Sequence, residues 1–102
     1  MSKSKKTLLS DDHAVALADL FRLLGDPTRL KIVVSCLRAP LAVSDIAERL
    51  GLSVSLVSHH LRLLKVARLV RADRQGKQVY YEADDFHVRR MVEDMVNHIA
   101  EH

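Results

Sequence analysis

The sequence has few of the residues that fill a large core or cross-link a small one. It contains no tryptophan, two phenylalanines and two tyrosines, so the core of this 102-residue chain must be mainly aliphatic. Cys36 is the only cysteine, which excludes an internal disulfide and makes any thiolate cluster dependent on a second chain. No apolar run reaches the length of a membrane span. We therefore expect one soluble, cytoplasmic domain without a membrane partner, small enough to gain burial by dimerising.

Acidic residues are nearly absent from the middle of the chain, although the formal net charge is only +3. Residues 55–80 carry six basic residues against one acidic residue, a net charge of +5. Residues 84–102 carry two basic residues against five acidic ones, a net charge of −3. A basic middle and an acidic end predict two surfaces with different partners.

The stretch 53–65 combines an absence of acidic residues with the apolar spacing of a helix. One face of that helix would be apolar, with Val54, Val57, Leu61 and Leu64. The opposite face would carry small hydroxyls, an imidazole and cations, with Ser55, Ser58, His59, Arg62 and Lys65. Short donors and positive charge on one side of a helix suit the major groove of DNA.

The residues before this stretch predict a helix-turn-helix. A supporting helix over about residues 44–50 would end at Gly51 in the left-handed conformation, and Ser53 would cap the next helix. Two helices joined by so short a turn, the second polar and basic on its outer face, form the DNA-binding helix-turn-helix pattern.

The residues after it predict a β-hairpin. Two short strands, 69–73 and 78–83, would be joined by a turn from Arg74 to Lys77, with Gly76 available for a positive φ. A basic hairpin directly after a recognition helix is a wing. Arg74 and Lys77 would then contact the DNA backbone, which positions the protein without reading bases.

The first and last predicted helices are more apolar than a small domain can cover. The first would begin near Asp11 or Asp12 and end at Gly25, and the last would begin at Asp84 or Asp85. Their apolar stripes comprise Val15, Ala18, Leu20, Phe21, Leu23 and Leu24 in the first helix, and Val88, Met91, Val92, Met95, Val96 and Ile99 in the last. We expect these two helices to form a dimer interface.

The predicted fold class is therefore mainly α-helical with a small β-hairpin, a winged helix-turn-helix that dimerises through its first and last helices. Residues 1–10 would be a disordered basic tail, and residues 11–102 would form the domain. Within it, Asp26 would cap a second helix that runs to about Leu37 and turns Leu30 inward.

Three segments resemble the ArsR/SmtB family of metal-sensing repressors: residues 24–30 (LGDPTRL), 57–64 (VSHHLRLL) and 74–81 (RQGKQVYY). The resemblance implies a homodimer that covers operator DNA and releases it when a metal binds. Many members that sense thiophilic ions carry Cys-Val-Cys where this chain has Ala42-Val43-Ser44, so sensing of arsenite, cadmium or lead through this segment is not expected. Many members have glycine where Arg68 stands. Because arginine disfavours the left-handed conformation, we expect the recognition helix to end differently.

The candidate metal ligands are Asp85, His87, His98 and Glu101, with His102 as an alternative fourth ligand. His87 and His98 share a helix face but lie roughly 16 Å apart along it, so one helix cannot bring both to one ion. Two antiparallel copies can, because the pairs 87/98 and 85/101 both place a two-fold axis near residue 93. The zinc-type members of the family show the same D-x-H-x(10)-H-x-x-E pattern in this helix. Such a ligand set suits Zn²⁺ or Co²⁺, whereas Ni²⁺ would want further ligands such as His102 or His13.

Other interpretations of these residues remain open. Asp85 could be only a helix cap and the histidines only surface residues, which would leave a winged-helix DNA-binding protein without a metal effector. A nickel- or cobalt-responsive repressor is the other alternative to a zinc-responsive one. A zinc hydrolase is disfavoured because four protein ligands leave no open position on the metal. We expect no enzymatic activity and no small-molecule substrate, because the sequence indicates neither a pocket nor a general base.

Overall fold

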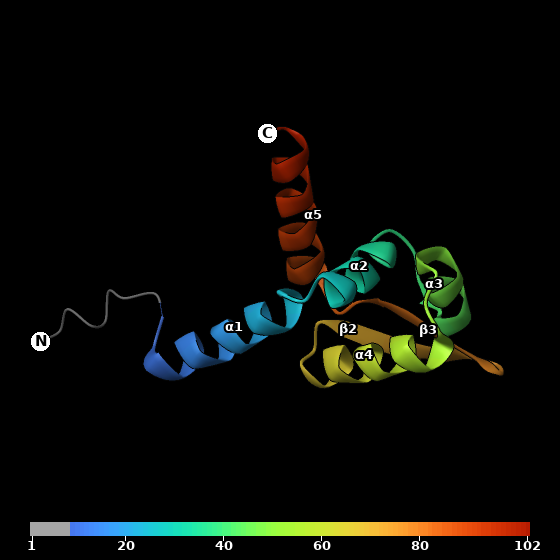
Figure 1. Ribbon diagram of the computed structural model, residues 1–102. Helices are drawn as coiled ribbons and strands as arrows, with labels where there is room; N and C mark the ends of the chain where they lie inside the picture. The colour runs from blue at the N-terminus through green and yellow to red at the C-terminus, as the bar shows by residue number, and fades with distance from the viewer. Residues whose placement is uncertain (1–8) are drawn as a thin grey trace, which may run out of the picture.

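Figure 1 shows the computed structural model, which describes residues 9–102 as a winged helix-turn-helix. Its elements are α1 (Asp11–Leu24), α2 (Pro27–Ser35), β1 (Leu41–Ala42), α3 (Val43–Leu50), α4 (Val54–Val66), β2 (Val70–Gln75), β3 (Gln78–Ala83) and α5 (Phe86–Ala100). The strands form one antiparallel sheet in the order β1-β3-β2. The predicted mainly α-helical winged helix-turn-helix is confirmed. Of the predicted tail, residues 1–8 lie outside the described part of the chain. No helix within residues 9–102 is long and apolar enough to span a membrane.

Side-chain caps fix where four of the helices begin. The predicted caps are confirmed at Asp26 of α2, Ser53 of α4 and Asp85 of α5, each accepting a hydrogen bond from a backbone N–H three residues on. Helix α1 begins at Asp11, as predicted, but its cap is Ser10, whose hydroxyl accepts a hydrogen bond from the N–H of His13. Asp11 and Asp12 lie in the first turn instead, where their charge suits the helix dipole.

Strand β1 was not predicted. Leu41 pairs with Tyr81 and Ala42 with Tyr80, so the connection between α2 and α3 adds an edge to the hairpin. α3 follows directly at Val43, one residue before the predicted start, and no side chain caps it. The short strand thus joins the helix-turn-helix to the wing.

The core lies between α2, α3, α4 and the sheet and is aliphatic, as the composition required. Its largest fully buried side chains are those of Ile32, Ile46, Leu61, Leu64, Leu69, Val33, Val57, Val70 and Cys36. Two predicted core residues are wrong. Val54 is 52% exposed because it is the first residue of α4, at the rim of the core. Leu30 is 38% exposed because it faces a groove between α1 and α5.

The recognition helix α4 ends in the left-handed conformation that the sequence analysis expected it to avoid. Arg68 has a φ of 62°. Its N–H donates to the carbonyl of Lys65 at 3.0 Å, and the N–H of Leu69 donates to the carbonyl of Leu64 at 2.9 Å. These two bonds form a Schellman motif, with Arg68 at the position that usually holds glycine. The backbone adopts this conformation because it turns Leu69, only 1% exposed, into the core.

Helices α1 and α5 project from the body of the molecule (Figure 1). Large apolar side chains on both helices are exposed. Leu24 is the buried residue of α1, and Val92 is that of α5. Between the two helices lies an apolar groove of about 490 Å³, lined by Phe21, Leu24, Leu30, Met91, Val92, Met95, Val96 and Ile99. Ile99 is 73% exposed and Phe21 50%, so a single chain does not cover this surface.

Candidate DNA-binding surface and metal site

The outer face of α4 is basic and has no partners within the described residues. Burial of Val57, Leu61 and Leu64 turns the opposite side of the helix outward. Its polar residues are Ser55, His59, Arg62 and Lys65, all exposed, and Ser58, which is half-buried. None of these side chains forms a hydrogen bond or ion pair within residues 9–102, so their donors are available to a ligand. The structure therefore places all four predicted α4 contact residues on one surface, although Ser58 is less accessible than the rest.

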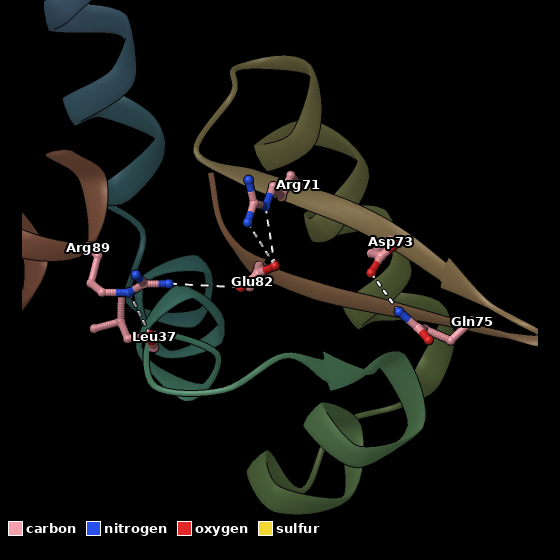
Figure 2. A network of polar contacts seen from close by, with 6 residues as sticks. All are labelled: Leu37, Arg71, Asp73, Gln75, Glu82 and Arg89. Carbon is pink, nitrogen blue, oxygen red and sulfur yellow. Dashed lines mark hydrogen bonds and ion pairs between the residues drawn. The ribbon is translucent and has the colours of Figure 1, made fainter. Parts of the chain in front are cut away.

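The wing, formed by β2 and β3, carries two further exposed cationic side chains, those of Arg74 and Lys77. Gly76 has a φ of 64°, which confirms the predicted turn, and Arg74 donates from Nη1 to its carbonyl oxygen at 3.5 Å. Lys77 is exposed. The nearby carboxylate of Asp73 accepts a hydrogen bond from Nε2 of Gln75 at 2.7 Å (Figure 2). Asp73 is thus bound to a neutral amide, and within the described residues no ion pair neutralises Arg74 or Lys77.

His60 is the residue of α4 that the sequence analysis passed over. It is half-buried, and its Nδ1 is buried without a hydrogen-bond partner in residues 9–102. Burial lowers the pKa of His60, and the positive charge of Arg29 lowers it further against the opposing effect of Asp26. The sequence could have indicated this position. Ser55, His59 and Arg62 have the spacing of one helix face, so the adjacent His60 must point away from that face. In the structure it lies near Arg29 of α2 and near Asp26, the cap of that helix.

Asp85 and His87 stand together at the start of α5. Asp85 is extended, with a φ of −151°, and its Oδ1 accepts a hydrogen bond from the N–H of Val88 at 3.0 Å. Since Asp85 precedes the helix, it is free of the rule that residues two apart on a helix point away from each other. Both residues are exposed, and the His87 ring lies edge-on to the ring of its neighbour Phe86, with centroids 6.0 Å apart.

The other candidate ligands stand at the end of the same helix. His98, Glu101 and His102 are exposed, and the rings of His98 and His102 lie 4.6 Å apart between centroids. Nδ1 of His102 lies 2.9 Å from the carbonyl oxygen of His98. A single chain does not bring the candidate ligands from the two ends of α5 together. Within residues 9–102, no three histidine, cysteine or acidic side chains are grouped closely enough to hold a metal.

A basic helix-turn-helix with a basic wing is the architecture of a DNA-binding regulator. The family model for the bacterial regulatory protein, arsR family, matches residues 26–72. The transcriptional repressor SmtB homolog of Synechocystis is 38% identical over 94 residues, which is 92% of this chain and 71% of that protein. The cadmium resistance transcriptional regulatory protein CadC homolog of Staphylococcus aureus is 38% identical over 102 residues, 99% of this chain and 84% of that protein.

A solved structure agrees with these relatives. The homodimeric winged helix-turn-helix DNA-binding domain of Mb0332 from Mycobacterium bovis, described as a possible ArsR-family regulator, superposes with a TM-score of 0.79 at 28% identity. The match covers 93% of this chain and 90% of that one. This chain belongs to the ArsR family. It is a DNA-binding transcriptional regulator and not an enzyme.

Proposed function

We propose that the protein is a zinc-responsive repressor that binds operator DNA as a homodimer in the cytoplasm and is released when zinc binds. One observation carries this proposal. The two halves of a four-ligand set, Asp85 with His87 and His98 with Glu101, stand at opposite ends of one helix. The apolar surface beside them, which includes Met95 and Ile99, is uncovered.

A second copy would complete both the burial and the ligand set. If two α5 helices pack antiparallel with the two-fold axis near residue 93, each end of one helix meets the other end of its partner. Asp85 and His87 of one protomer would then join His98 and Glu101 of the other. The dimer would hold two equivalent sites, and its apolar contacts would hold it together without metal. The homodimeric state of the similar Mycobacterium bovis domain supports this arrangement.

The donor chemistry favours zinc over softer metals. Two imidazoles and two carboxylates form a tetrahedral set for Zn²⁺ or Co²⁺. The similar protein from Staphylococcus aureus is named for cadmium resistance, but here no thiolate is on hand for a soft ion. Cys36 is fully buried, and burial raises the pKa of its thiol to about 11. The position of His102 beside His98 favours one second candidate, a nickel- or cobalt-responsive repressor with additional imidazole ligands.

In the DNA complex, α4 would enter the major groove and the wing would contact the backbone. Arg62 would read a base edge with Ser55, Ser58 and His59 beside it, and Arg74 and Lys77 would bind phosphates. The two α4 helices of a dimer must meet successive major grooves, about 34 Å apart. Zinc, by joining the α5 helices of the two protomers, would fix their mutual angle. A dimer held at another spacing loses contacts at one half-site.

The test is operator binding with and without each metal. Wild-type protein and His98→Gln are titrated onto an operator selected from random duplexes, in the absence of metal and with zinc, cobalt or nickel. For the zinc titration, the exposed His13→Gln on α1 serves as a matched histidine control, because His13 is a candidate ligand for nickel alone. We expect zinc to release wild type and His13→Gln, while His98→Gln binds the same operator and stays bound. Release of His98→Gln at the wild-type zinc concentration would contradict the proposed site, and no response of wild type to any metal would favour the effector-free alternative.

A further inference from the structure

Arg89, on the first turn of α5, contacts two other parts of the fold. Its Nε donates a hydrogen bond to the carbonyl oxygen of Leu37 at 2.9 Å, just past the end of α2. Its Nη2 lies 3.9 Å from Oε1 of Glu82 on β3 (Figure 2). A guanidinium is a rigid plane with several N–H groups and a full charge, so one side chain can donate to the Leu37 carbonyl and also pair with the Glu82 carboxylate.

Glu82 is in turn fixed from the neighbouring strand. Arg71 on β2 is its direct cross-strand partner, and Nε and Nη2 of Arg71 lie 3.2 and 3.1 Å from Oε2. The Glu82 side chain is only 19% exposed, compared with 58% for Arg71, so water screens this carboxylate less than a surface acid. Arg89 therefore meets an anchored carboxylate of the wing and not a mobile one.

These contacts have no equivalent elsewhere on α5. Within residues 9–102, Arg89 makes every side-chain hydrogen bond and ion pair that joins α5 to another element. The neighbouring Arg90 pairs only along its own helix, with Asp94 at 3.6 Å. The apolar contacts of α5 with the core come from Val88, Met91 and Val92, all in its first half. Beyond them the helix projects from the body of the molecule (Figure 1).

We propose that Arg89 is a positioning residue that fixes the direction of α5 relative to the wing and α2. The inference rests on the proposed dimer. If α5 forms the two-fold contact, its direction decides how far apart the two recognition helices lie. The network of Arg71, Glu82 and Arg89 then transmits any change in the α5 pair to the DNA-binding surfaces as a rigid-body movement. Without this network, α5 pivots on its three apolar contacts, and the distance between the two recognition helices takes a wide range of values.

The test measures that spacing directly. A nitroxide is attached at Glu48→Cys, an exposed position on α3 that forms no side-chain hydrogen bond or ion pair within the described residues. Cys36 escapes labelling because it is buried and its pKa is raised. Pulsed electron resonance then gives the distance between the two labels of the metal-free dimer. The substitutions compared are Arg89→Ala and, as the matched control one residue away, Arg90→Ala.

We expect Arg89→Ala to broaden the distance distribution and to lower operator affinity by about 3- to 30-fold. Arg90→Ala should leave both unchanged. Arg89→Lys keeps the charge but has one donor group in place of a fork, and should give an intermediate width; it carries the test if Arg89→Ala does not fold. A dimer whose distribution stays narrow in both Arg89 variants overturns this role. A sample without any inter-label distance, monomeric by sedimentation, overturns the proposed dimer instead.

Discussion

Replacing Arg68 by glycine should stabilise the protein. Arg68 has a φ of 62° and Gly51 a φ of 68°, so the same left-handed conformation follows both helices of the helix-turn-helix. An L-residue in this conformation costs roughly 1–2 kcal/mol. Replacing Arg68 by glycine removes this cost, but glycine also gives the unfolded chain more conformational freedom. That freedom lowers the free energy of unfolding by roughly 0.4–1 kcal/mol. The middle of each range gives a net gain of about 0.8 kcal/mol, which corresponds to a rise in Tm of about 3–6 °C for a domain near this size.

Thermal unfolding, followed by circular dichroism at one protein concentration, measures this change. The concentration must be held constant because the Tm of a dimer depends on it. Arg68→Ala removes the charge but keeps Cβ, so it should gain nothing from relief of the backbone. Gly51→Ala should lower stability by about 1 kcal/mol for the converse reason. If Arg68→Gly unfolds at no higher a temperature than Arg68→Ala, the left-handed residue is not strained and the reasoning is refuted.

Three further results are expected. Arg62→Ala should weaken operator binding by about 1–3 kcal/mol if Arg62 reads a base. Lys77→Ala should instead weaken binding to all sequences and flatten the salt dependence, as measured by fluorescence anisotropy. Wild-type operator affinity in Arg62→Ala would mean that α4 is oriented differently. Because the fold lowers the pKa of His60, stability should be full above about pH 6.5 and decline as the pH falls below it, and urea titrations should show a weaker decline for His60→Gln. Metal-free protein should sediment as a dimer at micromolar concentration, and a monomer would count against the apolar interface.

Local chemistry was enough to predict most of the fold. Helix caps and turn glycines act within a few residues, so the sequence alone predicts where helices begin and where turns lie. The caps are Asp26, Ser53 and Asp85, and the glycines are Gly51 and Gly76. The spacing of Val57, Leu61 and Leu64 likewise fixed which side of α4 is buried. From this orientation followed which residues of α4 face outward, and these are the proposed DNA contacts.

The predictions that failed depended on distant contacts. Arg68 takes a locally unfavourable conformation because Leu69 must reach the core and bond the carbonyl of Leu64. Strand β1 has only two residues and exists through pairing with Tyr80 and Tyr81, about forty residues away. The Arg89 network has the same origin, since its bond to Leu37 crosses 52 residues. No periodicity within a short window contains such information.

The metal ligands are a different case, because the proposed site needs a second chain. The arithmetic that places the two-fold axis near residue 93 depends on the spacing of Asp85, His87, His98 and Glu101 alone. The structure adds that these side chains are exposed and that Asp85 lies outside the helix, both of which an intermolecular site requires. The pairing of the two helices remains a prediction.

If zinc and DNA bind the same dimer with opposing preference, zinc must bind the free protein more tightly than the operator-bound protein. Coupling between two ligands is reciprocal, so the factor by which zinc weakens operator binding must equal the factor by which the operator weakens zinc binding. Competition titrations against a zinc chelator at pH 7, with and without saturating operator, give the second factor. We predict weaker zinc binding in the DNA complex, by the same factor. Equal zinc affinities in the two states would contradict the account.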